Sequence, residues 1–123
     1  MNKVVFITGA SSGIGIATAI KLANQGHTVY GSVRDLGDLK KYKDIMPVVL
    51  DMTNYKSLEK AVETIIKAEG KIDVLFNNAG YGLYGTVEET SIDDAKKQFD
   101  VNLFGLARLT QLVLPHMRAN GSG

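Results

Sequence analysis

Residues 8–15 form a glycine- and serine-rich segment whose composition suits phosphate binding. The segment reads Thr8-Gly9-Ala10-Ser11-Ser12-Gly13-Ile14-Gly15, and it joins a strand-like apolar run, Val4–Ile7, to a helix-like run that begins near Ile16. Glycine removes side-chain bulk from such a turn, and the free N–H groups and dipole of the following helix attract an anion. The pattern therefore predicts a site for a dinucleotide pyrophosphate. The alternative is an ordinary tight turn between a strand and a helix.

Ser32 and Arg34 bear on the choice between NAD(H) and NADP(H). A protein that prefers NAD usually places an acidic residue at the end of its second strand, where the carboxylate binds the ribose 2′-hydroxyl. We expect this position at Ser32, which does not repel a 2′-phosphate, and Arg34 follows two residues later. A guanidinium can form charge-assisted bonds to that phosphate, worth about 1.5–3 kcal/mol. We therefore expect NADP(H); the alternative for Arg34 is a solvated side chain at a strand end.

These residues need a scaffold, and the sequence predicts alternating strands and helices. The expected strands are Val4–Ile7, Thr28–Val33, 47–50 and 72–76. The expected helical segments are 16–25, a short piece at 36–42, one between a cap at Asn54 and Gly70, and a long stretch over 91–117. Within that last stretch, Gly105 should interrupt the helix and Pro115 should bend or end it.

This alternation indicates an α/β fold, a Rossmann-like, doubly wound parallel sheet. Two right-handed crossovers followed by a switch to the other side of the first strand give the strand order 3-2-1-4. A ligand should then lie above the carboxyl ends of the first and fourth strands. The sequence contains no internal repeat or domain linker, so we expect one nucleotide-binding domain over residues 1–123.

The composition excludes several other classes of function. The chain carries 14 basic and 13 acidic side chains, which argues against nucleic acid or an anionic membrane surface as partner. Cysteine is absent, so disulfides, thiol catalysis and zinc–thiolate sites are excluded. We expect no metal site, because no histidines or carboxylates have ligand spacing, and no apolar run is long enough to cross a bilayer. We expect a soluble, cytoplasmic protein without a signal peptide.

Several separate motifs together resemble the short-chain dehydrogenase/reductase family. They are the turn over residues 8–15, Asp51 after the third strand, residues 77–80 (Asn-Asn-Ala-Gly) after the fourth, and Asn102 in the last helix. The resemblance covers essentially the whole chain, with the motifs in the family's order and at its separations. It implies an oxidoreductase that transfers hydride between a nicotinamide cofactor and an alcohol or carbonyl substrate.

The resemblance also implies a role for each residue. Gly9, Gly13 and Gly15 would let the backbone approach the pyrophosphate, and Ser11, Ser12 and Ile14 would add polar and main-chain contacts. Asp51 would meet the adenine edge with its carboxylate and Met52 with its backbone N–H; a plain turn residue is the alternative for Asp51. The track from adenosine to nicotinamide would be lined by Asn78, Ala79 and Gly80, and Asn78 would also tie neighbouring strands together.

Asn102 matches the helix asparagine of the family's catalytic group, which bends the helix and holds a water near the catalytic lysine. The family also uses a tyrosine with a lysine four residues later as its acid–base pair. Here the residues found four positions after the five tyrosines are Arg34, Met46, Glu59, Gly85 and Glu88. We therefore expect a truncated, N-terminal part of a longer enzyme, inactive on its own.

The remaining expectations concern association, alternative functions and the substrate. The fourth strand should be an exposed apolar edge, so we expect a homo-oligomer formed by strand pairing, swapping or dimerisation, or else marginal stability. The first alternative function is a non-catalytic, nucleotide-binding and oligomerising module; a flavodoxin-like regulator is a weaker one, because it leaves residues 77–80 unexplained. Residues 29–36 are similar to family members that act on hydroxysteroids or retinoids, but the substrate stays open.

Overall fold

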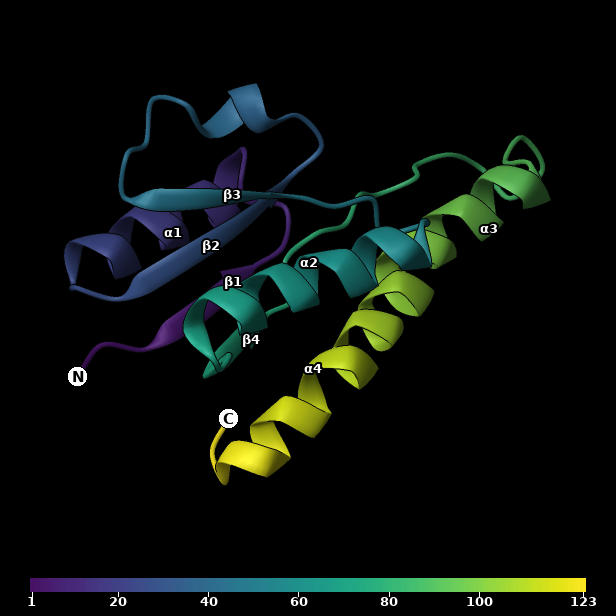
Figure 1. Cartoon of the computed structure of the whole chain (residues 1–123). Helices are drawn as coiled ribbons and strands as arrows, with labels where there is room; N and C mark the ends of the chain where they lie inside the picture. Colours follow the sequence, from purple (N-terminus) through teal and green to yellow (C-terminus); the bar gives the residue numbers. More distant parts are fainter.

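The apolar runs of the sequence form one parallel sheet in the computed structural model, which describes residues 1–123 (Figure 1). The strands are β1 (Val4–Ile7), β2 (Thr28–Val33), β3 (Ile45–Val49) and β4 (Val74–Phe76). Their order is β3-β2-β1-β4, and all three pairings are parallel. The predicted strand order is therefore confirmed. The order reverses between β1 and β4, and the carboxyl ends of these two strands share one edge of the sheet.

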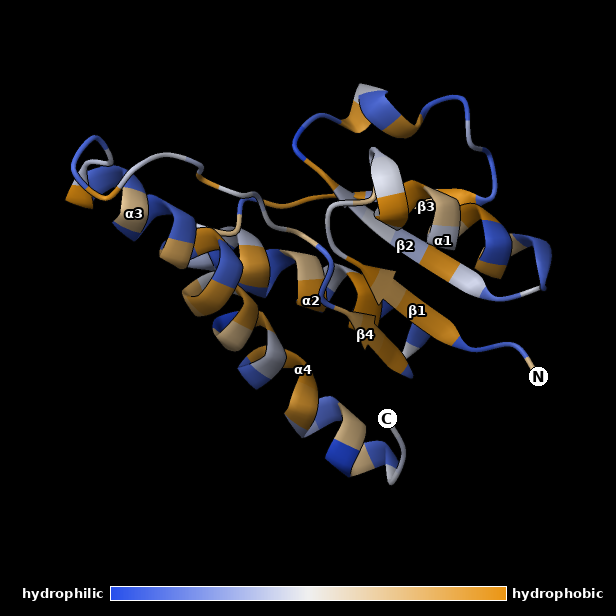
Figure 2. Ribbon diagram, turned by 180° about the vertical axis from the view of Figure 1, so that it is seen from behind, coloured by the Kyte–Doolittle hydropathy of each residue, from blue (hydrophilic) through white to orange (hydrophobic).

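Helices cover both faces of the sheet because every residue of β1 is buried and the strands present apolar side chains to either side (Figure 2). On one face, α1 (Gly13–Asn24) and the 3-10 helix Leu36–Leu39 pack on the first of two apolar clusters. On the other face, α2 (Tyr55–Glu69) and α4 (Leu106–Asn120) pack on the larger cluster. The remaining helix, α3 (Ile92–Phe99), buries no residue and extends beyond the sheet (Figure 1).

The predicted boundaries differ from the structure at several elements, and β4 begins at Val74 rather than at Ile72. The first helix begins at Gly13 rather than Ile16, so the glycine-rich turn supplies its first residues. The third strand begins at Ile45, ahead of the predicted start at Pro47; the missing N–H of Pro47 is tolerated because β3 lies at the edge of the sheet. The short helix is one 3-10 turn that stops at Leu39 instead of reaching Tyr42.

The last helical stretch is divided as expected at Gly105, but by a π-helical turn over Asp100–Gly105 rather than by a break. The sequence predicts that Pro115 bends or ends the helix, and it does not end it, since α4 continues through it to Asn120. Proline removes one helical hydrogen bond. Leu109 and Val113 are buried against the sheet, and this packing holds the helix together around Pro115.

At the other edge of the sheet, β4 pairs with β1 alone, and Val74 is 37% exposed. A mostly apolar hollow of about 310 Å³ lies beside it, between the strand and α4. The predicted exposed edge is therefore present. None of the helices combines the length and apolar character that crossing a membrane requires.

Candidate functional site

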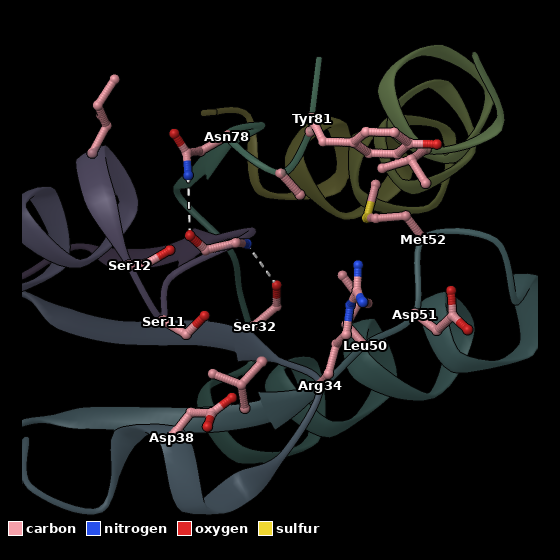
Figure 3. Close-up of a pocket in the computed structure, with 16 residues that line it drawn as sticks. Ser11, Ser12, Ser32, Arg34, Asp38, Leu50, Asp51, Met52, Asn78 and Tyr81 are labelled. Atoms are coloured by element: carbon pink, nitrogen blue, oxygen red, sulfur yellow. Dashed lines mark hydrogen bonds between the residues drawn. The ribbon is translucent and has the colours of Figure 1, made fainter. Parts of the chain in front are cut away.

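A cavity of about 600 Å³ opens at the carboxyl ends of the strands, between the start of α1 and the segments that follow β2, β3 and β4 (Figure 3). This volume lies within the usual range of ligand pockets. Most of the residues that the sequence predicts for the cofactor line it: Gly9, Ser11, Ser12, Ile14, Arg34, Asp51, Met52, Asn78, Ala79 and Gly80. Residues far apart in the chain thus converge where an α/β sheet of this order binds its ligand.

The amino-terminal end of α1 is open toward this cavity. Ser12 is the N-cap residue in an extended conformation, yet its side chain makes no capping hydrogen bond. The first N–H groups of a helix have no partner within the helix. Because Ser11, Ser12 and Ile14 also line the cavity, hydroxyl and backbone donors at the positive end of the helix dipole are available to an anion.

Gly13 and Gly15 do not line the cavity but shape the turn beneath it. A Cβ on Gly15 would overlap the carbonyl oxygen of Gly9 and lie 2.7 Å from Nδ2 of Asn78. Gly15 is thus required by the close approach of α1 to the turn. Gly13 has a φ of +56°, a backbone conformation that residues other than glycine rarely adopt.

The segment after β4 is fastened to the end of β1 by two side chains. Oγ1 of Thr8 accepts hydrogen bonds from the backbone N–H groups of Asn78 and Ala79, at 3.0 and 2.9 Å. In return, Nδ2 of Asn78 donates to the carbonyl oxygens of Thr8 and Gly9, both at 3.1 Å. The structural role predicted for Asn78 is therefore present, and Thr8 shares it.

Ser32 lies near the end of β2 and Arg34 directly after it, and the two side chains act differently. Ser32 is 4% exposed, and its Oγ accepts a hydrogen bond of 2.9 Å from the backbone N–H of Gly9 (Figure 3). Ser32 thus fixes the glycine-rich turn. Arg34 is exposed, makes no ion pair, and extends its guanidinium into the cavity.

Asp51 lines the cavity and also forms a local turn, the alternative role that the sequence predicts for this residue. Its Oδ1 accepts hydrogen bonds from the hydroxyl and the N–H of Thr53, at 2.7 and 2.9 Å. These bonds lower the pKa of the Asp51 carboxyl, and the positive charge of Arg34 adds a smaller attraction. Both functions are compatible, because the second carboxylate oxygen makes no hydrogen bond to the protein.

Asn102 lies in the π-helical turn and does not line the cavity. Its side-chain amide donates to the carbonyl oxygen of Tyr81 at 2.7 Å and accepts from the N–H of Tyr81 at 3.0 Å. One turn earlier, Oε1 of Gln98 accepts a hydrogen bond from the N–H of Leu83. The two amides hold the segment that leaves the cavity against the helical stretch.

The π-helical turn also contacts the loop that carries Met52. Gly105 is buried, and a Cβ there would overlap the carbonyl oxygen of Met52, a residue that is itself 7% exposed. Backbone of the last helical stretch therefore lies directly against the loop that carries Asp51 and Met52.

Sequence reasoning missed two kinds of contribution to this site. The hydroxyl groups of Thr8 and Ser32 support the turn, and a hydroxyl inside an apolar strand is the signal that could have shown this role. The cavity is also lined by Val33, Asp38, Leu50 and Val101. Asp38 follows Arg34 by four residues, and this short separation could have placed it at the same mouth.

The comparisons with known proteins agree with this geometry. A family model described as short chain dehydrogenase matches residues 3–123. The chain belongs to the short chain dehydrogenase family.

No group of three or more His, Cys, Asp or Glu side chains is arranged to hold a metal ion.

Relatives in this dehydrogenase family match over nearly all of the chain. It is 41% identical over 116 residues to the 3-ketodihydrosphingosine reductase of Bacteroides thetaiotaomicron, covering 94% of this chain and 42% of that protein. A short-chain dehydrogenase from Streptomyces avermitilis superposes with a TM-score of 0.94 at 37% identity, covering 99% of this chain and 47% of the other.

The L-sorbose reductase of Gluconobacter frateurii, solved in complex with NADPH and L-sorbose, gives a TM-score of 0.91 at 30% identity, with 99% and 50% of the two chains covered. The chain thus spans about half the length of the relatives it matches. Proteins of this family use nicotinamide cofactors.

Proposed function

We propose that this chain is the cofactor-binding part of an NADP(H)-dependent oxidoreductase that interconverts an alcohol and a carbonyl compound. One observation carries the proposal: the glycine-rich turn, the open end of α1, Arg34 and the segment after β4 all face a single cavity. Membership in the dehydrogenase family supports the reaction type.

The residues present fit a dinucleotide. The open end of α1, where the Ser12 side chain makes no capping hydrogen bond, offers the hydroxyl and backbone donors that a pyrophosphate at a helix terminus needs. Ser11, Ser12 and Ile14 would hold the pyrophosphate. Asp51 and Met52 would hold the adenine, and the nicotinamide half would lie along Asn78, Ala79 and Gly80. When bound, the cofactor would donate hydride to a carbonyl compound in its reduced form or accept hydride from an alcohol in its oxidised form.

The preference for NADP(H) is proposed from Arg34. Its exposed, unpaired guanidinium lies at the mouth beyond β2, where the adenosine ribose would reach, and no acidic residue occupies the end of β2. Ser32 contributes by leaving this position neutral, with its hydroxyl engaged by Gly9. The NADPH named in the L-sorbose reductase complex supports the same choice.

Titration of the chain with NADPH and NADH, followed by fluorescence, tests both the site and the preference. We expect Arg34→Ala to weaken NADPH about ten- to a hundredfold and to leave NADH nearly unchanged, as loss of charge-assisted bonds predicts. Lys43→Ala, which removes an exposed cation that does not line the cavity, is the matched control. An unchanged ratio of the two affinities in Arg34→Ala would refute the NADP(H) assignment.

Asn102 is proposed as a positioning residue for catalysis. Its side-chain amide is used by the backbone of Tyr81, so its contribution would come through the shape of the π-helical turn and the segment it holds. No tyrosine here has a lysine four residues later, so these residues alone lack the family's acid–base pair. We therefore expect cofactor binding without turnover, and NADPH oxidation across a panel of carbonyl compounds would contradict this.

The second candidate is a nucleotide-binding module that associates with itself, favoured by the open edge of β4. Beside this edge, Nδ2 of Asn77 donates to Thr110, while the buried Oδ1 of Asn77 has no hydrogen-bond partner. A second copy pairing along β4 could cover this hollow and supply a donor. Sedimentation that shows a well-folded monomer at high concentration would contradict association.

The cytoplasmic location stays a prediction from composition.

A further inference from the structure

The charges that line the cavity are unevenly balanced. The lining includes one cation, Arg34, and two carboxylates, Asp38 and Asp51. Asp51 is partly compensated by its two hydrogen bonds from Thr53. The carboxylate of Asp38 has neither a hydrogen bond nor an ion pair anywhere in the chain, so its full negative charge faces the cavity and solvent.

The position of Asp38 is set by the 3-10 helix Leu36–Leu39. Oδ1 of Asp35 caps this helix by accepting from the N–H of Gly37 at 2.8 Å, and Leu39 anchors it in the core at 2% exposure. The N–H of Asp38 itself donates to the carbonyl oxygen of Asp35 at 3.1 Å. The carboxylate is therefore carried by a fixed turn rather than by a loose loop.

Figure 3 draws Asp38 at the end of the cavity where Ser11 and Arg34 also lie, away from Asn78. On the proposed function, on which this inference rests, that end receives the adenosine ribose. A 2′-phosphate placed there meets the attraction of Arg34 and the repulsion of Asp38 together. A ribose with a free 2′-hydroxyl carries no charge at this position and meets neither.

We propose that Asp38 is a specificity-determining residue that opposes the 2′-phosphate and limits the preference for NADP(H) that Arg34 creates. The cavity is then tuned for a modest preference between the two cofactors rather than an absolute one. Removing the carboxylate should strengthen binding of the phosphorylated nucleotide selectively, because like charges repel and the phosphate carries nearly two negative charges at neutral pH.

The test compares adenosine 2′,5′-bisphosphate with 5′-AMP, two ligands that differ only in the 2′-phosphate, by calorimetric titration of the chain. For Asp38→Asn we expect the bisphosphate to bind about three- to fivefold more tightly, and 5′-AMP to change less than about twofold, in line with exposed charge pairs. The gain should shrink between about 0.02 and 0.5 M salt, because ions screen exposed charges.

Asp44→Asn is the matched control, since Asp44 is exposed, lies outside the cavity and loses the same charge. Asp38→Ser is the second variant, should the amide introduce a new hydrogen bond. Equal changes for both ligands, or the same gain in Asp44→Asn, would overturn the inference while the proposed function stands. If neither ligand binds the unaltered chain, the proposed function fails and this inference fails with it.

Discussion

Replacing Thr8 by valine tests the connection between β1 and the segment that follows β4. The two side chains have nearly the same shape, so the change removes the hydroxyl and little else. Thr8 is fully buried, and its Oγ1 accepts from the N–H groups of Asn78 and Ala79. Each buried N–H left without a partner costs about 1–3 kcal/mol. Because this segment is only partly buried, we expect a total loss of about 2–4 kcal/mol in the free energy of unfolding.

Thr8→Ser is the control, because it keeps the hydroxyl and loses one buried methyl group, worth about 1 kcal/mol. Urea unfolding measures both variants, and equal m-values establish that stabilities rather than denatured states are compared. We also expect Thr8→Val to weaken NADPH binding, since Asn78 and Ala79 line the cavity. A valine variant as stable as the wild type, or less damaged than the serine variant, would refute the reasoning.

Two other predictions concern the turn and the core. Gly15→Ala should weaken NADPH and NADH alike by about tenfold or more, because its methyl group would overlap the carbonyl oxygen of Gly9 and push α1 away; titration showing normal affinity would contradict this. Burial and a hydrogen bond of 2.8 Å to Glu69 raise the pKa of Tyr30 to about 12. The fold thus favours the protonated phenol, and this stabilisation is complete below pH ~10 and lost toward pH ~12. Between pH ~9 and ~11 the wild type should lose about 1 kcal/mol more than Tyr30→Phe by urea unfolding, and parallel losses would argue against it.

The strand order could be predicted because it follows from local signals and a rule of chirality. Each strand is a short apolar run bounded by glycine or a polar turn, and right-handed crossovers leave few arrangements. The continuation of α4 through Pro115 could not be predicted in this way. The local rule ends a helix at proline, and the burial of Leu109 and Val113 that overrides it exists only in the folded chain.

The residues of the site also fall into two groups, those that the sequence reveals and those that only the fold brings together. Gly9, Gly13 and Gly15 could be predicted because their spacing matches a tight turn whose backbone needs glycine. The hydroxyl of Ser32 reaches Gly9 only because β1 and β2 pair in a particular register, in which Ile7 lies opposite Gly31. Such a partner depends on which strands become neighbours, so no single segment of the sequence reveals it.

The contact between Gly105 and the carbonyl oxygen of Met52 has a consequence for anyone who engineers this domain. Exchanging a helical glycine for alanine is a standard way to raise thermal stability. Here the added methyl group would push the loop that carries Asp51 and Met52 away from the helix that supports it. A substitution chosen to stabilise the fold would then weaken the binding of a nucleotide, although Gly105 does not line the cavity.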